Sequence, residues 1–206
     1  MNHISNIQTP SYGPAPKNIF FLTCDAYGIL PPISKLDSAQ AMYHFISGYT
    51  AKVAGTEAGV TEPKATFSAC FGAPFMPLHP TEYAALLGER INKFKPNIWL
   101  VNTGWSGGVY GVGNRIKLSY TRALLAAALS GELNHIEYEK HSIFGLNFPK
   151  GCSNVPDNML NPRNTWKDQL AYDQMSIELA RKFKENFDKY RSKASAEILA
   201  VEPKIS

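Results

Sequence analysis

The sequence predicts an α/β fold in which a mixed β-sheet is flanked by helices. Two short runs, residues 19–22 and 98–101, are continuously apolar, which is typical of strands that are covered on both faces. Amphipathic helical patterns lie between and after these runs. We therefore expect strands at 18–24 and 98–102, with a further candidate at 65–71.

Four segments have the apolar spacing of helices. The first is expected to begin at a capping box formed by Asp37 and Gln40, and the others are expected at about 81–94, 121–129 and 165–190. The second helix follows a proline, which is accepted in a first turn. Its expected apolar face consists of Tyr83, Leu86, Leu87, Ile91 and Phe94.

Length and composition indicate one ordinary globular unit. The chain has 206 residues, of which 44% are hydrophobic and 18% charged, and its net charge is only +4. Because it has no long basic run and no apolar stretch of about 18 residues, we expect neither nucleic-acid binding nor a membrane span. Three widely spaced cysteines, Cys24, Cys70 and Cys152, form no disulfide or metal-binding pattern, so a cytoplasmic protein is expected. The first two lie in strand contexts and are expected to be buried.

The chain is expected to divide into three parts. Residues 1–17 contain three prolines and a glycine and no signal-peptide pattern, so they should be irregular. Residues 18–190 should form the domain, and residues 191–206 a tail.

Glycines are concentrated in residues 102–115, where five of the fourteen residues are glycine, all of them within 104–113. One explanation is close approach of the backbone to a phosphate or a base, and the other is a mobile surface loop without a ligand. The chain contains no G-x-x-x-x-G-K-[ST] phosphate loop.

Three residues after this loop could line one wall of a pocket. Arg115 offers a flat cation, Ile116 an apolar contact and Thr121 a hydroxyl. The alternative for Arg115 is a solvated surface charge. The histidines lack the spacing of metal ligands, so no metal site and no catalytic residue is assigned. The residues alone thus indicate an α/β domain with one glycine-rich ligand loop and no complete catalytic constellation.

Six strings of residues, taken together and in order, resemble ATP-dependent phosphoenolpyruvate carboxykinase, from about His3 to Tyr190. They are NIFFLTCDAYGILPPIS (18–34), YTAKVAGTEAGVTEPKATFSACFGAPF (49–75), LVNTGW (100–105), RIKLSYTRALL (115–125), NPRNTW (161–166) and FKENFDKY (183–190).

The resemblance implies part of the C-terminal nucleotide-binding domain of a carboxykinase-like fold. The family converts oxaloacetate and ATP to phosphoenolpyruvate, ADP and CO2 in gluconeogenesis, with Mg and Mn ions. Arg115, Ile116 and Thr121 match family positions that contact ATP at the adenine end of its site, which implies an adenine-binding wall, and residues 56–68 match the lid over the active site. The family's phosphate loop, metal ligands and oxaloacetate-binding arginines lie upstream of the matching part, so oxaloacetate and phosphoenolpyruvate are expected as ligands only together with that part.

The resemblance leaves two hypotheses for the 206 residues alone. In the first, the chain is a portion of the enzyme that has no turnover by itself. In the second, it is a non-catalytic nucleotide-binding or interaction module. Homo-oligomerisation is left open. Asp25, which follows the first strand, is interpreted either as a residue near the nucleotide or as a local backbone cap.

Overall fold

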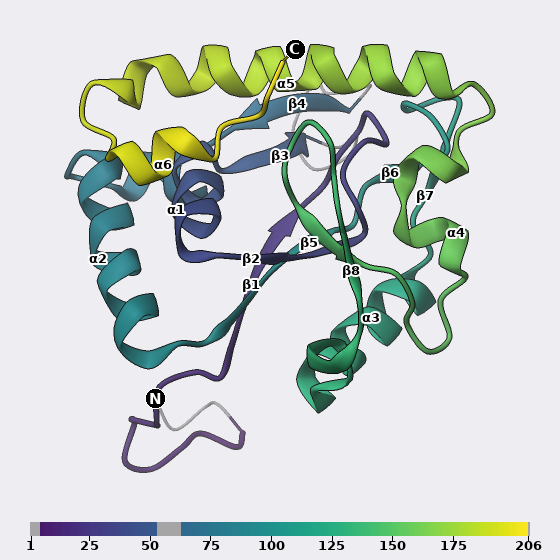
Figure 1. The fold of residues 1–206 in the computed structure, drawn as a ribbon. Helices are drawn as coiled ribbons and strands as arrows, with labels where there is room; N and C mark the ends of the chain where they lie inside the picture. Colours follow the sequence, from purple (N-terminus) through teal and green to yellow (C-terminus); the bar gives the residue numbers. More distant parts are fainter. Residues whose placement is uncertain (1–4, 53–62, 206) are drawn as a thin grey trace.

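The fold is built around a mixed sheet of five strands (Figure 1), in a computed structural model that describes residues 5–52 and 63–205. In spatial order the strands are β1 (Asn18–Thr23), β5 (Asn97–Asn102), β2 (Ile33–Leu36), β9 (Asn147–Pro149) and β8 (Tyr138–Lys140). β1 and β5 run parallel, and the other neighbouring strands are antiparallel. This mixed sheet agrees with the predicted fold class.

Two short hairpins accompany the sheet. β3 (Tyr49–Lys52) pairs with β4 (Lys64–Phe67), and β6 (Trp105–Ser106) pairs with β7 (Asn114–Arg115). The second hairpin encloses the glycine-rich loop. The helical elements are α1 (Ser38–Ser47), α2 (Pro80–Phe94), α3 (Leu118–Ser130), α4 (Asp157–Leu160), α5 (Gln169–Arg191) and α6 (Ala196–Ala200), with short 3-10 turns η1 (Ala69–Phe71), η2 (Ala73–Phe75), η3 (Glu132–His135) and η4 (Pro162–Thr165).

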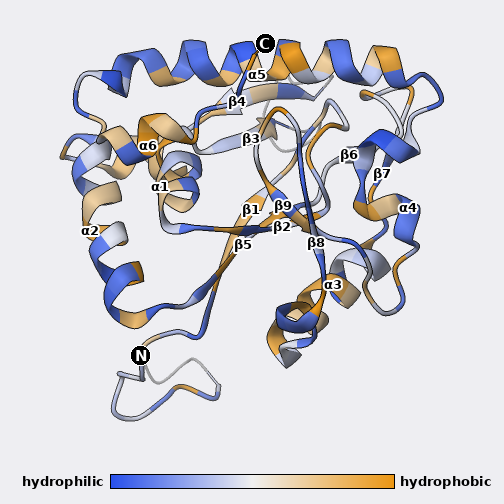
Figure 2. Cartoon of the chain, viewed as in Figure 1, coloured by the Kyte–Doolittle hydropathy of each residue, from blue (hydrophilic) through white to orange (hydrophobic). Residues whose placement is uncertain are grey.

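The sheet is covered on both faces at its centre. Ile98 and Leu100 of β5 pack into a cluster with α1 and α5, whereas Trp99 and Val101 pack into a second cluster with α3. Side chains alternate across a strand, so one apolar run supplies both clusters. Hydrophobic colour accordingly marks the central strands (Figure 2). The prediction of a strand buried on both faces is confirmed for β5.

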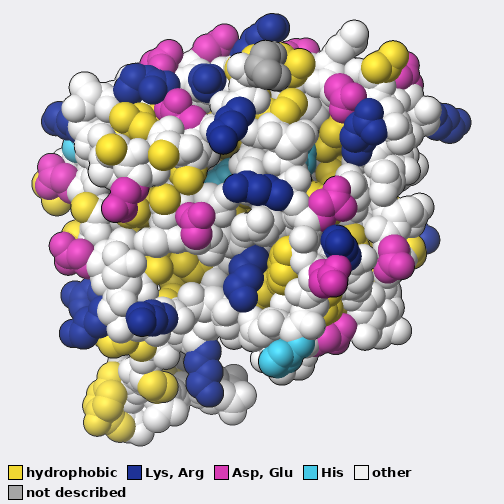
Figure 3. Space-filling model, in the orientation of Figure 1, with side chains coloured by type: hydrophobic (Ala, Val, Ile, Leu, Met, Phe, Trp, Pro, Cys, Tyr) yellow, Lys and Arg dark blue, Asp and Glu magenta, His cyan; other side chains and the backbone are white. Residues whose placement is uncertain are grey.

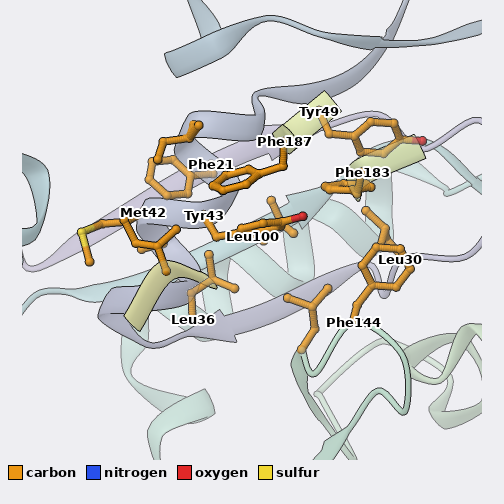
Figure 4. Packing of buried hydrophobic residues seen from close by; sticks show 14 of the residues in the cluster. Phe21, Leu30, Leu36, Met42, Tyr43, Tyr49, Leu100, Phe144, Phe183 and Phe187 are labelled. Carbon is orange, nitrogen blue, oxygen red and sulfur yellow. The ribbon is translucent and has the colours of Figure 1, made fainter. Parts of the chain in front are cut away.

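Aromatic side chains fill the larger cluster (Figure 4). The rings of Tyr43 and Phe187 stack with centroids 4.6 Å apart, and those of Tyr49 and Phe183 lie 4.9 Å apart. These contacts hold α1 and β3 against α5. On the face shown in Figure 3, basic and acidic side chains are interspersed.

Several expected boundaries need correction. β1 lies at one end of the strand order, and Leu22 is 60% exposed, so this strand is not covered on both faces as predicted. The candidate strand at 65–71 ends at Phe67 because Cys70 and Phe71 have positive φ angles of 55° and 56°, which no strand accepts. The last long helix begins at Gln169 rather than near 165.

The apolar face predicted for α2 is also partly wrong. Leu86 and Phe94 are 51% and 45% exposed, and the buried residues are Ala84, Gly88 and Ile91. A Cβ on Gly88 would meet the sulfur of Met42 of α1 at 2.7 Å, so the glycine leaves room for that side chain between the two helices. The capping box at the start of α1 is confirmed, with Asp37 and Gln40 bonded reciprocally.

The ends of the chain and the lid are described only in part. Residues 5–17 contain no helix or strand. Within 191–206, α6 packs its buried Ile198 into the larger cluster. Of the lid expected at 56–68, residues 56–62 lie outside the described residues, and the remainder includes β4. No helix in the described ranges is long and apolar enough to cross a membrane.

Candidate active-site region

The loops that leave β1 and β5 are joined where both strands end. Asn102, which is fully buried, accepts hydrogen bonds at Oδ1 from the backbone N–H groups of Asp25 (3.0 Å) and Gly104 (2.8 Å). Its Nδ2 donates to the carbonyl oxygen of Leu30 at 2.8 Å. The carboxyl ends of parallel strands are where open α/β sheets bind ligands, so we expect a site at this edge.

Asp25 is fully buried beneath the same loops. Its Oδ1 accepts from Tyr27 N (2.9 Å) and from the Tyr49 hydroxyl (2.8 Å), and its Oδ2 accepts from Ile29 N (2.6 Å) and Leu30 N (2.8 Å). Burial raises the pKa of this carboxyl above its ordinary value, and the four hydrogen bonds act in the opposite direction. Of the two interpretations of Asp25, local backbone capping is the one that these contacts describe.

The polar contacts continue through the interior. The Tyr172 hydroxyl donates to Ile29 O at 3.0 Å and lies 2.8 Å from His141 Nε2, while His141 Nδ1 accepts from the N–H groups of Ile143 and Phe144. Because Nδ1 accepts, the ring proton is assigned to Nε2. Burial lowers the pKa of His141 to about 4. We call Asp25, Tyr49, Asn102, His141 and Tyr172 the buried hydrogen-bond network.

The glycine-rich loop lies directly on this network. A Cβ on Gly104 would overlap the backbone of Asp25, and Trp105 N donates to Asp25 O at 2.8 Å. A Cβ on Gly28 would likewise overlap the carbonyl of Gly108. At these positions glycine allows the protein's own loops to approach each other closely, rather than a ligand to approach the backbone.

Arg115 of β7 is held in place at the end of this loop. Its Cζ lies 4.8 Å from the centroid of the Trp105 ring, and its Nε donates to Thr103 O at 3.0 Å. Trp105 in turn makes an edge contact with Tyr110. The terminal guanidinium nitrogens have no hydrogen-bond partner in the described part of the chain. The side chain is therefore oriented with its terminal nitrogens available to a ligand.

A cavity of about 600 Å³ adjoins Arg115, a volume within the range of small-molecule sites. The first wall, from β7 and the start of α3, consists of Asn114, Arg115, Lys117 and Tyr120. The second wall, from α4 and η4, consists of Asn158, Met159, Asn164 and Thr165. Ser106 and Gly107 complete the lining.

The three residues predicted to form a pocket wall are not equivalent in the structure. Arg115 is exposed and lines the cavity, whereas Ile116 and Thr121 are each 7% exposed and are not among its lining residues. Ile116 N donates to Gly104 O at 2.9 Å, which ties the residue after Arg115 to the glycine-rich loop. The structure thus brings Arg115 to the cavity and keeps the other two in the adjacent interior.

The second wall has no counterpart in the predicted site. Thr165 Oγ1 accepts from Gly107 N (2.9 Å), lies 3.1 Å from Ser106 Oγ and donates to Pro162 O (2.6 Å), so the wall is bonded to the glycine-rich loop. The only signal in the sequence was the string NPRNTW, which contributed to the resemblance without a role. A pattern of local spacing cannot show that residues about fifty positions apart share a cavity.

The sequence also predicts two buried cysteines and assigns no metal site. Cys24 and Cys70 are buried, as expected, and burial raises the pKa of both thiols, that of Cys70 to about 11. Across residues 5–52 and 63–205, no three His, Cys, Asp or Glu side chains gather in a way that could hold a metal ion.

Comparison with known proteins gives a consistent result. The family model described as phosphoenolpyruvate carboxykinase matches residues 1–158. The chain is 63% identical over 203 residues to the phosphoenolpyruvate carboxykinase (ATP) of Christiangramia forsetii and 62% identical over 203 residues to that of Flavobacterium johnsoniae. It is 58% identical over 201 residues to the enzyme of Geobacter metallireducens. Each match covers 98% of this chain but only 38% of the relative, so the chain spans well under half of these relatives.

Proposed function

This chain belongs to the ATP-dependent phosphoenolpyruvate carboxykinase family, and from that premise we propose that it supplies the nucleotide side of such an enzyme's active site. The proposed reaction is the conversion of oxaloacetate and ATP to phosphoenolpyruvate, ADP and CO2 in gluconeogenesis, in the cytoplasm. Within it, Arg115, Ile116 and Thr121 form the adenine-binding wall of the ATP site, and residues 56–68 act as the lid.

The orientation of Arg115 is the observation that carries the proposal. Its guanidinium rests on Trp105 and is fixed through Nε, while its terminal nitrogens lie at a cavity of ligand size. A planar cation held in this way can stack on a base or donate charge-assisted hydrogen bonds to it. Preorganisation lowers the entropic cost of binding, since the side chain does not have to be ordered by the ligand.

Ile116 and Thr121 are given supporting roles. The N–H of Ile116 is bonded to Gly104, so Ile116 sets the backbone position from which Arg115 extends. Thr121 lies buried in α3, the helix whose first residues contribute to the same cavity. Both residues are therefore proposed to act close to the nucleotide but with less exposed contact than Arg115.

Phosphate and metal chemistry are assigned elsewhere. The family uses divalent metals, but the described residues of this chain do not fit a metal site, so we derive no step from a metal held here. We assign that chemistry to the part of the relatives that this chain does not cover, and no turnover to the 206 residues alone. The contribution proposed for this chain is to bind and orient the nucleotide.

Substitution of Arg115 by alanine tests this function. We expect Arg115→Ala to weaken ATP binding about tenfold or more, because a hydrogen bond to a charged group contributes about 1.5–3 kcal/mol. Isothermal titration calorimetry with the 206-residue chain measures the change. The matched control is Arg122→Ala, which removes an exposed arginine of α3 that does not line the cavity. Equal ATP affinity of Arg115→Ala and the unaltered chain would refute the assignment.

A further inference from the structure

We propose that Trp105 is a positioning residue for the nucleotide site, whose indole ring fixes the plane in which Arg115 presents its guanidinium to the ligand. This inference rests on the proposed function, since it takes Arg115 to be the residue that meets the nucleotide. Trp105 itself is not among the residues that line the cavity, so it acts through Arg115 and not by contact with the ligand. The resemblance gives this tryptophan no role.

The short hairpin of β6 and β7 places the two side chains opposite each other. Trp105 of β6 and Arg115 of β7 are directly paired in the antiparallel register. Side chains at such positions lie on the same face of the two strands and within reach of each other. The Cζ of Arg115 accordingly lies 4.8 Å from the centroid of the indole ring. The contact thus follows from the hairpin, whose strands the glycine-rich loop joins.

The indole ring is held firmly enough to serve as a support. Trp105 is only 7% exposed, and its backbone N–H donates to Asp25 O at 2.8 Å. Its ring makes an edge contact with Tyr110, with centroids 5.5 Å apart and an interplanar angle of 82°. It packs in a small apolar cluster with Cys24, Ala26 and Ala51. Because an enclosed side chain keeps one rotamer, the ring stays in place without a ligand.

Arg115 needs this support because its other contact fixes only one atom. Its Nε donates to Thr103 O at 3.0 Å, and a single hydrogen bond leaves the guanidinium free to turn about the line from Nε to its acceptor. A cation over an indole face is attracted by the ring quadrupole, and tryptophan is the strongest of the aromatic residues in this contact. The hydrogen bond and the ring together therefore define the position and the plane of the guanidinium.

This arrangement leaves one face of the guanidinium and its terminal nitrogens for the ligand. Trp105 covers the opposite face, and no residue that the structure describes accepts a hydrogen bond from the terminal nitrogens. An ordered planar cation binds a flat base with a smaller loss of conformational entropy than a mobile one. Loss of the ring should therefore weaken ATP binding although it removes no contact with ATP.

The order of the Arg115 side chain tests the inference without a ligand. ¹⁵N relaxation of the arginine Nε–H groups gives an order parameter for each of these side chains in the 206-residue chain. Trp105→Leu and Trp105→Phe form a matched pair, because both remove volume but only phenylalanine keeps an aromatic face. We expect the order parameter of Arg115 to fall below about 0.6 with leucine and to stay high with phenylalanine. Arg122, which is exposed, should be unchanged in both.

The affinity for ATP, measured by isothermal titration calorimetry, tests whether this order matters for binding. We expect Trp105→Leu to weaken ATP binding about fivefold and Trp105→Phe to stay within about twofold of the unaltered chain. Added to Arg115→Ala, Trp105→Leu should change the affinity by less than about twofold, because no guanidinium is left to position.

The melting temperature of each variant verifies that it is folded. If Trp105→Leu does not fold, Trp105→Met takes its place in both measurements, because methionine adapts to the space without an aromatic face.

The outcomes separate this inference from the proposed function. If Arg115→Ala weakens ATP binding but Arg115 keeps its order in Trp105→Leu, or loses it without a change in ATP affinity, the positioning role is refuted and the proposed function stands. Equal losses in Trp105→Leu and Trp105→Phe would refute it too, because volume and not the aromatic face would then matter. If Arg115→Ala leaves ATP binding unchanged, the proposed function fails and the role toward the nucleotide with it, while the relaxation measurement still decides whether Trp105 orders Arg115.

Discussion

The buried hydrogen-bond network and the cavity beside it lie around the same loops but differ in how they use polar groups. In the network, Asp25 and Asn102 are fully buried, and their side-chain oxygens accept six hydrogen bonds from the chain itself. In the cavity, Asn158 and Asn164 are exposed and make none to the described residues.

This difference separates stability from binding. A buried donor that loses its acceptor cannot turn to water, so substitutions in the network should lower the free energy of unfolding. An exposed amide is solvated with or without a ligand, so substitutions in the cavity should leave stability almost unchanged and alter affinity instead. The network thus supports the loops, and the cavity is where we propose that a ligand binds.

Removal of the Asp25 carboxylate should break the network with the largest effect. Asp25→Ala leaves three backbone N–H groups and the Tyr49 hydroxyl without an acceptor. At about 1–3 kcal/mol for each unsatisfied buried group, the loss should exceed about 3 kcal/mol. Urea denaturation measures it, with Asp157→Ala, an exposed acid of α4, as the control. A loss below about 1 kcal/mol would show that the network is not needed for stability.

Acid should weaken the same network through His141. Burial lowers its pKa from 6.5 to about 4, so between these values the unfolded chain binds the proton and the folded chain does not. Stability should therefore be complete above pH 6.5 and decrease as the pH falls toward 4, by an amount on the order of 3 kcal/mol at 1.36 kcal/mol per pKa unit.

His141→Asn isolates this effect, because asparagine retains an acceptor near the N–H groups of Ile143 and Phe144 but does not titrate. The slope of unfolding free energy against pH between 4 and 6.5 should be reduced in this variant. His135→Asn, on an exposed side chain, should leave the slope as it is. An unchanged slope in His141→Asn would contradict the assignment.

Gly104→Ala should lower stability less than the loss of Asp25 or the protonation of His141. It tests whether the two regions are coupled, because Gly104 N donates to Asn102 of the network and the residue lies close to Arg115 of the cavity. The added Cβ would overlap the backbone of Asp25, and the strain should cost about 1–3 kcal/mol. Since Gly104 O accepts from Ile116 N, the displacement should reach Arg115 and weaken ATP binding as well. Gly151→Ala is the control, as its Cβ would meet only ordinary contacts. Lower stability with unchanged ATP affinity would mean that the two regions are not coupled.

The sequence predicted those features that depend on neighbouring residues. The capping box of Asp37 and Gln40 requires only one helical turn, and the apolar run of β5 shows its double burial directly. The apolar face predicted for α2 is partly wrong, because a hydrophobic pattern is dominated by large apolar side chains and does not register small residues that are buried. Contact with α1 instead uses Gly88, a residue that adds nothing to an apolar pattern.

The sequence predicted only that part of the site which a single segment of the chain contributes. Arg115 was identified because it ends a loop with an unusual concentration of glycine and because its string resembles the family. The second wall was not predicted, because Asn158 lies outside the six strings and the string NPRNTW, which contains Asn164, contributed to the resemblance without a role. Their shared cavity with Arg115 depends on the hydrogen bonds of Thr165 to Ser106 and Gly107.

By itself, the sequence determined the class of fold, the buried strand β5 and the family of the chain. Periodicity, capping and ordered strings are local properties that a linear sequence carries completely. The tertiary structure alone decided that β1 is less covered than β5, that Asp25 caps backbone in the interior, and that α4 and η4 complete the cavity. These features arise from contacts between distant residues, whose energies depend on which groups folding removes from water and which it leaves exposed.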